Sequence, residues 1–251
     1  MFYRLFFWTP VFCVGLLCSP SYSSEPTFLH QIEPQAKMIL NRMTVFMDTL
    51  QQFTFHAENT EDRLLSSGQK IQFAWAVDVA IRRPNRFRAS VKGDEKDQQL
   101  FYNGRTITLW NTHLNYYGIL AAPPNIEEAL DFASESFGLH APLADFIRHD
   151  SFDPFPPFIY SAVYMGQHLV HGISCHHLAF RQDDLDWQVW IEDSETPLPR
   201  KVIITQKFVT GAPQFTALLL DWNLAPQLPD RHFTFSPPKN AKKIEFLSAA
   251  P

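Results

Sequence analysis

Five residues that could bind zinc or act in nucleophilic catalysis lie within ten positions: His168, His171, Cys175, His176 and His177. On a strand, Cys175 and His177 would share one face and His176 would point to the other. The segment has neither a CxxC pair nor two histidines one helical turn apart, which are common zinc-binding spacings. We therefore interpret it as a histidine-rich hairpin and expect no metal ion and no cofactor. A metal-dependent enzyme using the His168–His177 hairpin is the alternative function.

Two other motifs match catalytic or metal-binding loops only in part. Residues 172–176 begin like the nucleophile elbow of hydrolases, but they lack its last glycine and are expected between two strands rather than between a strand and a helix. Asp183, Asp184 and Asp186 lack the later bidentate acid that a calcium loop requires. We assign no catalytic residue, and we expect that the chain is not an enzyme.

The first 23 residues are typical of a cleavable export signal. A single positive charge at Arg4 precedes an apolar stretch from Leu5 to Leu17, and Ser21 and Ser23 occupy the −3 and −1 positions of a cleavage site. Cys18 follows Leu17, where a lipoprotein signal would have a small residue, so lipidation of Cys18 is the less favoured alternative. We expect residues 1–23 to be a signal peptide, residues 24–251 to form a single domain, and the protein to be periplasmic.

The composition points to aromatic-rich strands that end at prolines. The chain has 23 Phe and 6 Trp, with 19 Pro and only 9 Gly, which suits strands separated by short turns. Its formal net charge is −5 and its basic residues form no stripe, so nucleic acid is excluded as a partner. No segment after the signal is long and apolar enough for a transmembrane helix, so we expect at most peripheral membrane contact.

Hydrophobic periodicity predicts two helices within a series of strands. A stripe with three- and four-residue steps predicts a helix from Pro34 to Phe53. A second helix should begin after a cap at Asn125 and run to about Phe137. The clearest strand is Gln69–Arg82, and Asn103-Gly104 predicts a tight hairpin. The other predicted strands are 87–91, 100–102, 106–110, 116–120, 161–168, 174–182, 186–192, 200–208, 214–223, 233–235 and 243–246.

This arrangement resembles a known family. The hairpin Asp186–Asp193, which turns through Thr196–Arg200, and the C-terminal motif Phe233–Pro238 are similar to segments of the DUF2092 family of predicted periplasmic proteins, in the LolA/LolB-like lipoprotein-carrier superfamily. The resemblance covers most of the chain after the signal. The best matching segments are 68–88, 101–110, 172–181, 186–204 and 212–235.

The resemblance implies an α+β fold, a curved open antiparallel β half-barrel with helices covering its concave face. It also implies a non-enzymatic periplasmic binding or carrier protein for a lipid, an acyl chain or an acylated protein. No latch residue of the lipoprotein carriers is matched. A fully packed core would show the same apolar pattern, so an envelope interaction protein is a further alternative.

Alternation along the strands selects the residues that would line such a concave face. We expect them to lie beneath the first helix and the central helical insert and to bind the apolar ligand. The sequence names neither the ligand nor an oligomeric state. The expected hydrophobic ligand-binding residues are Phe73, Trp75, Val77, Phe87 and Leu109.

Overall fold

The computed structural model describes residues 31–137, 143–144 and 159–246 of the chain. The expected signal peptide, residues 1–23, lies outside these ranges. No helix within the described residues has the length and apolar character that a membrane span needs.

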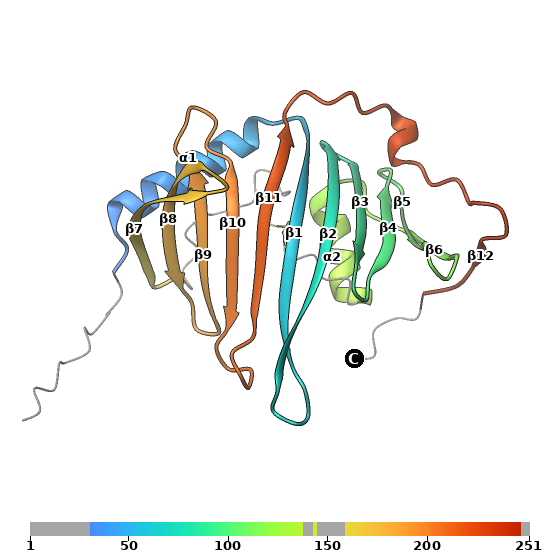
Figure 1. Cartoon of the computed structure of the whole chain (residues 1–251). Coiled ribbons are helices and arrows are strands. Elements are labelled where there is room, and N and C mark those ends of the chain that lie inside the picture. The colour runs from blue at the N-terminus through green and yellow to red at the C-terminus, as the bar shows by residue number, and fades with distance from the viewer. Residues whose placement is uncertain (1–30, 138–142, 145–158, 247–251) are drawn as a thin grey trace, which may run out of the picture.

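A large curved sheet forms the body of the molecule (Figure 1). Its twelve described strands follow the order β12-β6-β5-β4-β3-β2-β1-β11-β10-β9-β8-β7. Neighbouring strands are antiparallel, except that β12 pairs with β6 in parallel. The sheet is open, because β12 and β7 form its two edges. Both helices lie on the same face of the sheet, behind it in Figure 1. The expected open antiparallel half-barrel is therefore confirmed.

Most strands match the predicted series, but β1 was not among the predicted strands, and its first residues were assigned to the preceding helix. Their bounds are β1 Gln52–Leu64, β2 Lys70–Arg82, β3 Arg86–Gly93, β4 Asp97–Tyr102, β5 Thr106–Asn111, β6 Tyr116–Ala121, β7 Ser161–Val170, β8 Ile173–Arg181, β9 Leu185–Glu192, β10 Pro199–Gln206, β11 Gln214–Asn223 and β12 Lys242–Lys243.

The hairpin of β1 and β2 forms the centre of the sheet. The two strands pair along their whole lengths, from Gln52 opposite Arg82 to Leu64 opposite Lys70. Successive side chains of a strand point to opposite faces, and alternate residues of β1 and β2 are buried on the face that carries the helices. We call this the concave face and the opposite one the convex face. Among the buried residues are Phe53, Phe55, Ala57, Val77, Val79 and Ile81.

Helix α1 spans Pro34–Thr49 and lies against β7 and β9. Pro34 occupies the start of the helix, where a missing N–H costs no hydrogen bond. The helix ends before the predicted Phe53, because the chain from Gln52 onwards pairs with β2. Its buried stripe belongs to the same apolar cluster as the concave face and consists of Ala36, Ile39, Leu40, Met43 and Met47.

Helix α2 spans Ile126–Phe137 and begins at the predicted cap. The side-chain oxygen of Asn125 accepts a hydrogen bond of 2.8 Å from the backbone N–H of Glu128. Glu127 and Glu128 lie in the first turn, where the helix dipole favours negative charge. Ile126, which follows the cap, is buried in the main apolar cluster. This helix therefore starts at a fixed position against the concave face.

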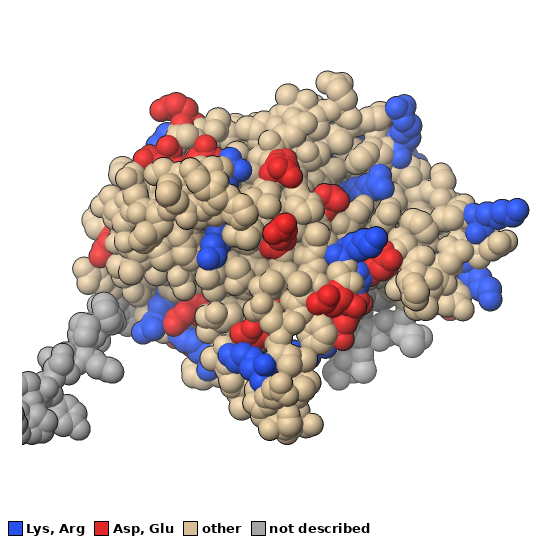
Figure 2. Space-filling view, viewed as in Figure 1, with Lys and Arg blue, Asp and Glu red and all other residues tan. Residues whose placement is uncertain are grey.

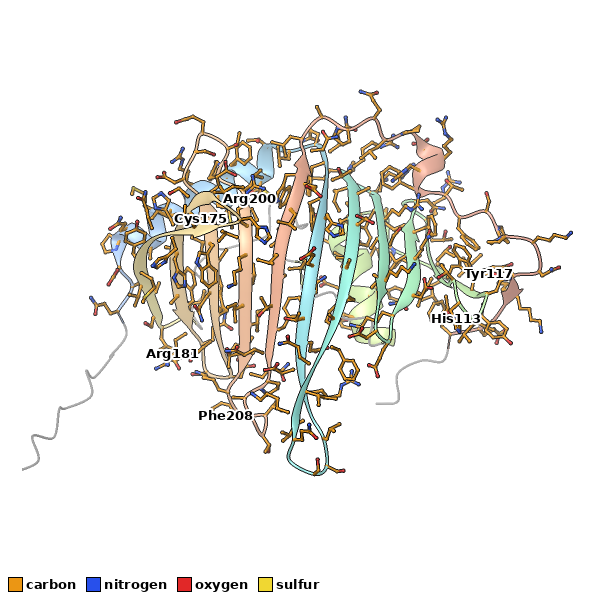
Figure 3. The ribbon with its side chains drawn as sticks, viewed as in Figure 1. His113, Tyr117, Cys175, Arg181, Arg200 and Phe208 are labelled. Atoms are coloured by element: carbon orange, nitrogen blue, oxygen red, sulfur yellow. The ribbon has the colours of Figure 1, made fainter. Side chains whose placement is uncertain are left out.

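The C-terminal segment crosses the convex face instead of forming the predicted strand at residues 233–235. Asp230–Phe233 is a short 3₁₀ helix, and Phe233 is fully buried against Ala80 and Leu228. The strand prediction was wrong because Phe233 is buried and Phe235 is half-buried through side-chain contacts, without any pairing to a neighbouring strand. The ring of Phe235 packs against those of Phe101, Trp110 and Tyr117, with Tyr117 labelled near the β6 edge in Figure 3.

Charges of both signs are interspersed over the convex face. Figure 2 shows this face, and acidic and basic groups alternate on it without forming a stripe of one sign. Several form pairs, such as Arg82 with Asp230, and Arg181 with Asp186 at 3.0 Å. On the described part of this face, the charges are therefore mixed and partly paired.

Candidate functional site

A cavity of about 320 Å³ lies between α2 and the strands β2 to β5 on the concave face. This volume is at the small end of the range of roughly 300–1,000 Å³ that is usual for ligand sites. The lining is mostly aliphatic and aromatic. It consists of Asn59, Trp75, Val77, Val79, Phe87, Ala89, Val91, Lys96, Gln98, Leu100, Tyr102, Ile107, Leu109, Ile126, Ala129, Leu130, Ala133, Leu143 and Phe215.

The register of the strands brings these side chains together. Val79 lies opposite Ala89, and Leu100 lies opposite Leu109, so one apolar row crosses four strands. Residues directly opposite each other in a ladder share a face of the sheet. Small residues leave the space open, because alanines occupy positions of β3 and α2 where larger side chains would fill it. These alanines are Ala89, Ala129 and Ala133.

Four of the five residues expected to bind the ligand line this cavity: Trp75, Val77, Phe87 and Leu109. The fifth, Phe73, lies farther along β2 and is outside the lining. The guanidinium of Arg63 is 4.3 Å from the centre of its ring. The alternation of β2 placed Phe73 on the correct face, but the cavity ends at Trp75.

Only one of the two described helices covers the cavity. The lining includes Ile126, Ala129, Leu130 and Ala133 of α2 but no residue of α1. The expectation that the first helix also lies above these residues was wrong, because α1 packs on the other half of the sheet, against β7 and β9.

The polar groups of the lining gather at its Trp75 end. Asn59 lies opposite Trp75 in the ladder of β1 and β2, and the Lys96 ammonium is 3.5 Å from the centre of the Trp75 indole ring. Burial lowers the pKa of Lys96, and Glu61 partly offsets this effect. Gly93 is opposite Trp75 on β3, and a Cβ there would be only 2.3 Å from the Cβ of Trp75. Because Gly93 has no side chain, the backbone of β3 can lie close to Trp75 of β2.

The opposite end is closed by Tyr102. Its hydroxyl donates to the carbonyl oxygens of Pro123 at 2.5 Å and Asn125 at 2.9 Å. Burial raises the pKa of this phenol to about 12. Tyr102 therefore fixes the start of α2 over the sheet and has no feature of an acid or base at neutral pH.

Sequence reasoning did not name the other lining residues, among them Asn59, Lys96 and Phe215. Asn59 is a polar residue on the concave side of β1, where the alternation could have revealed it. The ring of Phe215, on β11, is 5.9 Å from that of Trp75. Lys96 lies in the turn between β3 and β4, and no periodic signal in the sequence places a turn residue.

The histidine-rich hairpin of β7 and β8 does not assemble a metal site. His177 Nδ1 is 3.2 Å from His168 Nδ1, and its ring stacks on Trp190 at 3.9 Å. Burial lowers the pKa of His177. His176 is on the opposite face, where its Nε2 is 3.0 Å from Asp193. Within the described ranges, no three His, Cys, Asp or Glu residues are arranged to hold a metal ion.

Cys175 is fully buried on the convex side of β8. It packs with Val170 and Trp190, and burial raises the pKa of its thiol to about 11. Figure 3 shows Cys175 at the same end of the sheet as Arg200, which forms an ion pair with Glu192 of β9. This environment keeps the thiol protonated at neutral pH, which is the opposite of what a nucleophile needs.

A second hollow, of about 420 Å³, lies on the other side of the sheet and is more polar. His56 Nδ1 is 2.7 Å from Asp78 Oδ1 there, across β1 and β2. Arg88 and Asp221 also line it. Its lining combines acids and bases, so it has neither the apolar surface of the first cavity nor a single sign of charge.

Solved structures that are similar to this chain share little sequence identity with it and superpose with TM-scores below 0.5. An uncharacterized conserved protein from Thermus thermophilus is 10% identical, with a TM-score of 0.48, and the match covers 84% of this chain and 99% of the other. Lipoprotein LppX from Mycobacterium tuberculosis is 14% identical, with a TM-score of 0.49 and coverage of 79% and 100%. A LolA superfamily protein from Nitrosomonas europaea is 11% identical, with a TM-score of 0.38 and coverage of 80% and 97%.

Sequence comparison is more decisive about the family. No curated protein matches the chain in sequence. The model of the DUF2092 family, described as predicted periplasmic protein, matches residues 36–247, which is well over half of the chain. This match includes the strands and helices that form the cavity. The expected periplasmic location is thereby confirmed, and the chain belongs to the DUF2092 family of predicted periplasmic proteins.

Proposed function

We propose that this protein is a non-enzymatic periplasmic binding or carrier protein that holds an apolar chain in the cavity beneath α2. The chain would belong to a lipid or to an acylated protein. One observation carries the proposal, namely the continuous apolar lining of a 320 Å³ cavity between α2 and the sheet. A cavity of this volume favours the proposal over a fully packed core, the alternative left open by the sequence.

The energetics of the cavity suit one acyl chain. Each buried methylene contributes about 0.8 kcal/mol. A segment of about ten carbons would gain about 8 kcal/mol, from which the cost of ordering the ligand must be subtracted. The expected dissociation constant is therefore micromolar or weaker. Such an affinity allows both capture and release, as a carrier requires.

The experiment is titration of the mature protein with a fluorescent fatty acid. Leu109→Glu should abolish binding, because an unpaired carboxylate in an apolar cavity is very unfavourable. Leu109 suits this test better than Trp75, because a carboxylate at position 75 would lie beside the ammonium of Lys96. The matched control is Ile119→Glu on the neighbouring strand β6, where Ile119 is 39% exposed.

Three outcomes are informative once circular dichroism shows that both variants fold. Saturable binding that is lost in Leu109→Glu and kept in Ile119→Glu supports the proposal. Equal binding by both variants would place the apolar site elsewhere. If the folded wild type binds no acyl probe, the proposed function fails.

A further inference from the structure

The cavity is chemically asymmetric along its length. Its three polar side chains, Asn59, Lys96 and Gln98, all belong to the Trp75 end or the adjacent row of the sheet. The rows beyond them are apolar up to Tyr102, whose hydroxyl is already satisfied by two carbonyl groups. A ligand with one polar end and one apolar chain would therefore bind in a single direction.

Lys96 provides a positive charge at that end. Its ammonium lies over the Trp75 ring at 3.5 Å, and it forms no ion pair with the part of the chain that the structure describes. The nearby Glu95 is paired with Arg63 at 2.9 Å. Among the described residues, the closest partner of this half-buried ammonium is the indole face of Trp75, with the carboxylate of Glu61 also acting on its charge. The ammonium therefore retains hydrogen-bond donors for an incoming anion.

Asn59 provides an acceptor. Its side chain is almost completely buried, with 2% exposed, and its Oδ1 has no hydrogen-bond partner among the described residues. Its Nδ2 faces the carbonyl oxygens of Ala57 and Trp75, both at 3.4 Å. This arrangement leaves the amide oxygen, rather than the amide nitrogen, without a partner. A buried acceptor without a partner is costly, and a donor on a ligand would remove that cost.

We propose, building on the proposed function, that the ligand is a single-chain acyl anion whose head also carries a hydrogen-bond donor. The anion binds beside the Lys96 ammonium, and the donor, a hydroxyl or amide N–H, binds Asn59 Oδ1. The acyl chain extends along the apolar rows toward Phe87 and Ile107. Hydroxylated fatty acids have this chemistry.

The test compares three probes of equal chain length in displacement of a bound fluorescent fatty acid: a 3-hydroxy fatty acid, the unsubstituted acid and its methyl ester. A charge-assisted hydrogen bond in a partly buried site corresponds to about a tenfold change in affinity or more. We expect the wild type to bind the unsubstituted acid at least about tenfold more tightly than the ester, and the hydroxy acid more tightly still.

Variants assign each preference to its residue. Lys96→Gln should bring the affinity for the acid down to that for the ester, and Lys96→Arg should retain the preference. Lys92→Gln is the matched control, because Lys92 is exposed on β3 and pairs with Ala76 on the convex face. Asn59→Leu should remove the advantage of the hydroxy acid over the unsubstituted acid without changing the preference for the acid over the ester.

The outcomes separate this inference from the function on which it rests. If the three probes bind the wild type with equal affinity, the assignment of the head group is wrong, whereas the acyl-binding function stands. Loss of the charge preference in Lys92→Gln as well as in Lys96→Gln would show a general charge effect and would also overturn the assignment. If none of the probes displaces the dye and the dye itself does not bind, the proposed function fails.

Discussion

The thiol of Cys175 is buried, and its Sγ lies 3.5 Å from the carbonyl oxygen of Ile173. We expect iodoacetamide at pH 8 to modify the folded protein far more slowly than the protein unfolded in urea, because the folded thiol is both protonated and inaccessible. Mass spectrometry over time measures this rate. Modification at equal rates would show that β8 opens readily and would contradict the packing seen around Cys175.

The raised pKa of the Cys175 thiol predicts that the free energy of unfolding depends on pH. Its folded pKa of about 11 lies above the usual value of 9.0, so the unfolded chain loses this proton first. The contribution of Cys175 to stability is therefore complete below pH 9 and is lost as the pH rises toward 11. Urea unfolding should show a steeper decline in wild type than in Cys175→Ala over this window. The substitution itself should cost about 1 kcal/mol at pH 7.

The buried amide oxygen of Asn59, which lacks a hydrogen-bond partner among the described residues, should lower the stability of the ligand-free protein. We expect Asn59→Leu to raise the free energy of unfolding by about 1 kcal/mol, because the substitution removes a buried oxygen that lacks a partner. Urea denaturation of the ligand-free protein measures the change. A fall in stability would show that the two 3.4 Å contacts of Nδ2 are worth more than the oxygen costs.

At the scale of elements, Arg83 joins the end of α1 to the central hairpin. Its guanidinium donates to the carbonyl oxygens of Met47, at 3.1 Å, and Leu50. Arg83→Met keeps the aliphatic stem but leaves these carbonyls without the donor, so we expect a loss of about 2–3 kcal/mol in the free energy of unfolding. The control is Arg42→Met on the exposed surface of α1, which should cost less than about 1 kcal/mol. Equal costs for the two variants would contradict a special role for Arg83.

Periodicity was sufficient to predict most of the elements. The alternation of β2 gave its bounds to within one residue, and the Asn103-Gly104 signal marked the hairpin of β4 and β5. In that hairpin, the side-chain oxygen of Asn103 accepts from the backbone N–H of Thr106 at 2.9 Å. A helix or turn with local hydrogen bonds, or a strand with one buried face, can be predicted from the pattern of its own residues.

The cavity could be predicted only in part, for a physical reason. Alternation shows which face of a strand is apolar, and it therefore placed Trp75 and Val77 correctly. It does not show how far a helix extends over that face or which turn residue folds back onto it, because both depend on strand register and on contacts distant in sequence. The polar end of the site, with Asn59 and Lys96, was missed for this reason.

Across the whole molecule, the two halves of one sheet are covered differently. On the half under α1, Leu178 and Val189 are fully buried and Phe180 stacks on Trp187 at 3.8 Å. On the half under α2, alanines at 89, 129 and 133 leave the cavity. One apolar cluster runs through both halves. We infer that the half under α1 contributes most of the stability, and that the half under α2 is packed less densely so that a ligand can bind there.

This division predicts opposite effects of two core substitutions. Ala133→Phe should fill the cavity and lower the affinity for a fluorescent fatty acid at least about tenfold, while stability stays within about 1 kcal/mol of the wild type because the new ring occupies existing space. Leu178→Ala should lower the free energy of unfolding by about 2–5 kcal/mol and leave the affinity of the folded protein unchanged. Urea denaturation and probe titration of both variants measure the two effects.

The pair of variants can fail in distinct ways. Ala133→Phe would lose several kcal/mol of stability if the space beneath α2 were closed in solution, because overpacking a filled core forces strain on its neighbours. If instead Ala133→Phe folds and binds the probe as the wild type does, the acyl chain lies outside the cavity. A loss of affinity in folded Leu178→Ala would show that the two halves are coupled, since Leu178 lies on β8, beyond the strands that line the cavity. The division of the sheet into a stabilising half and a ligand-binding half requires both results together. Ala133→Phe must lose binding and keep its stability, and Leu178→Ala must lose stability and keep its binding.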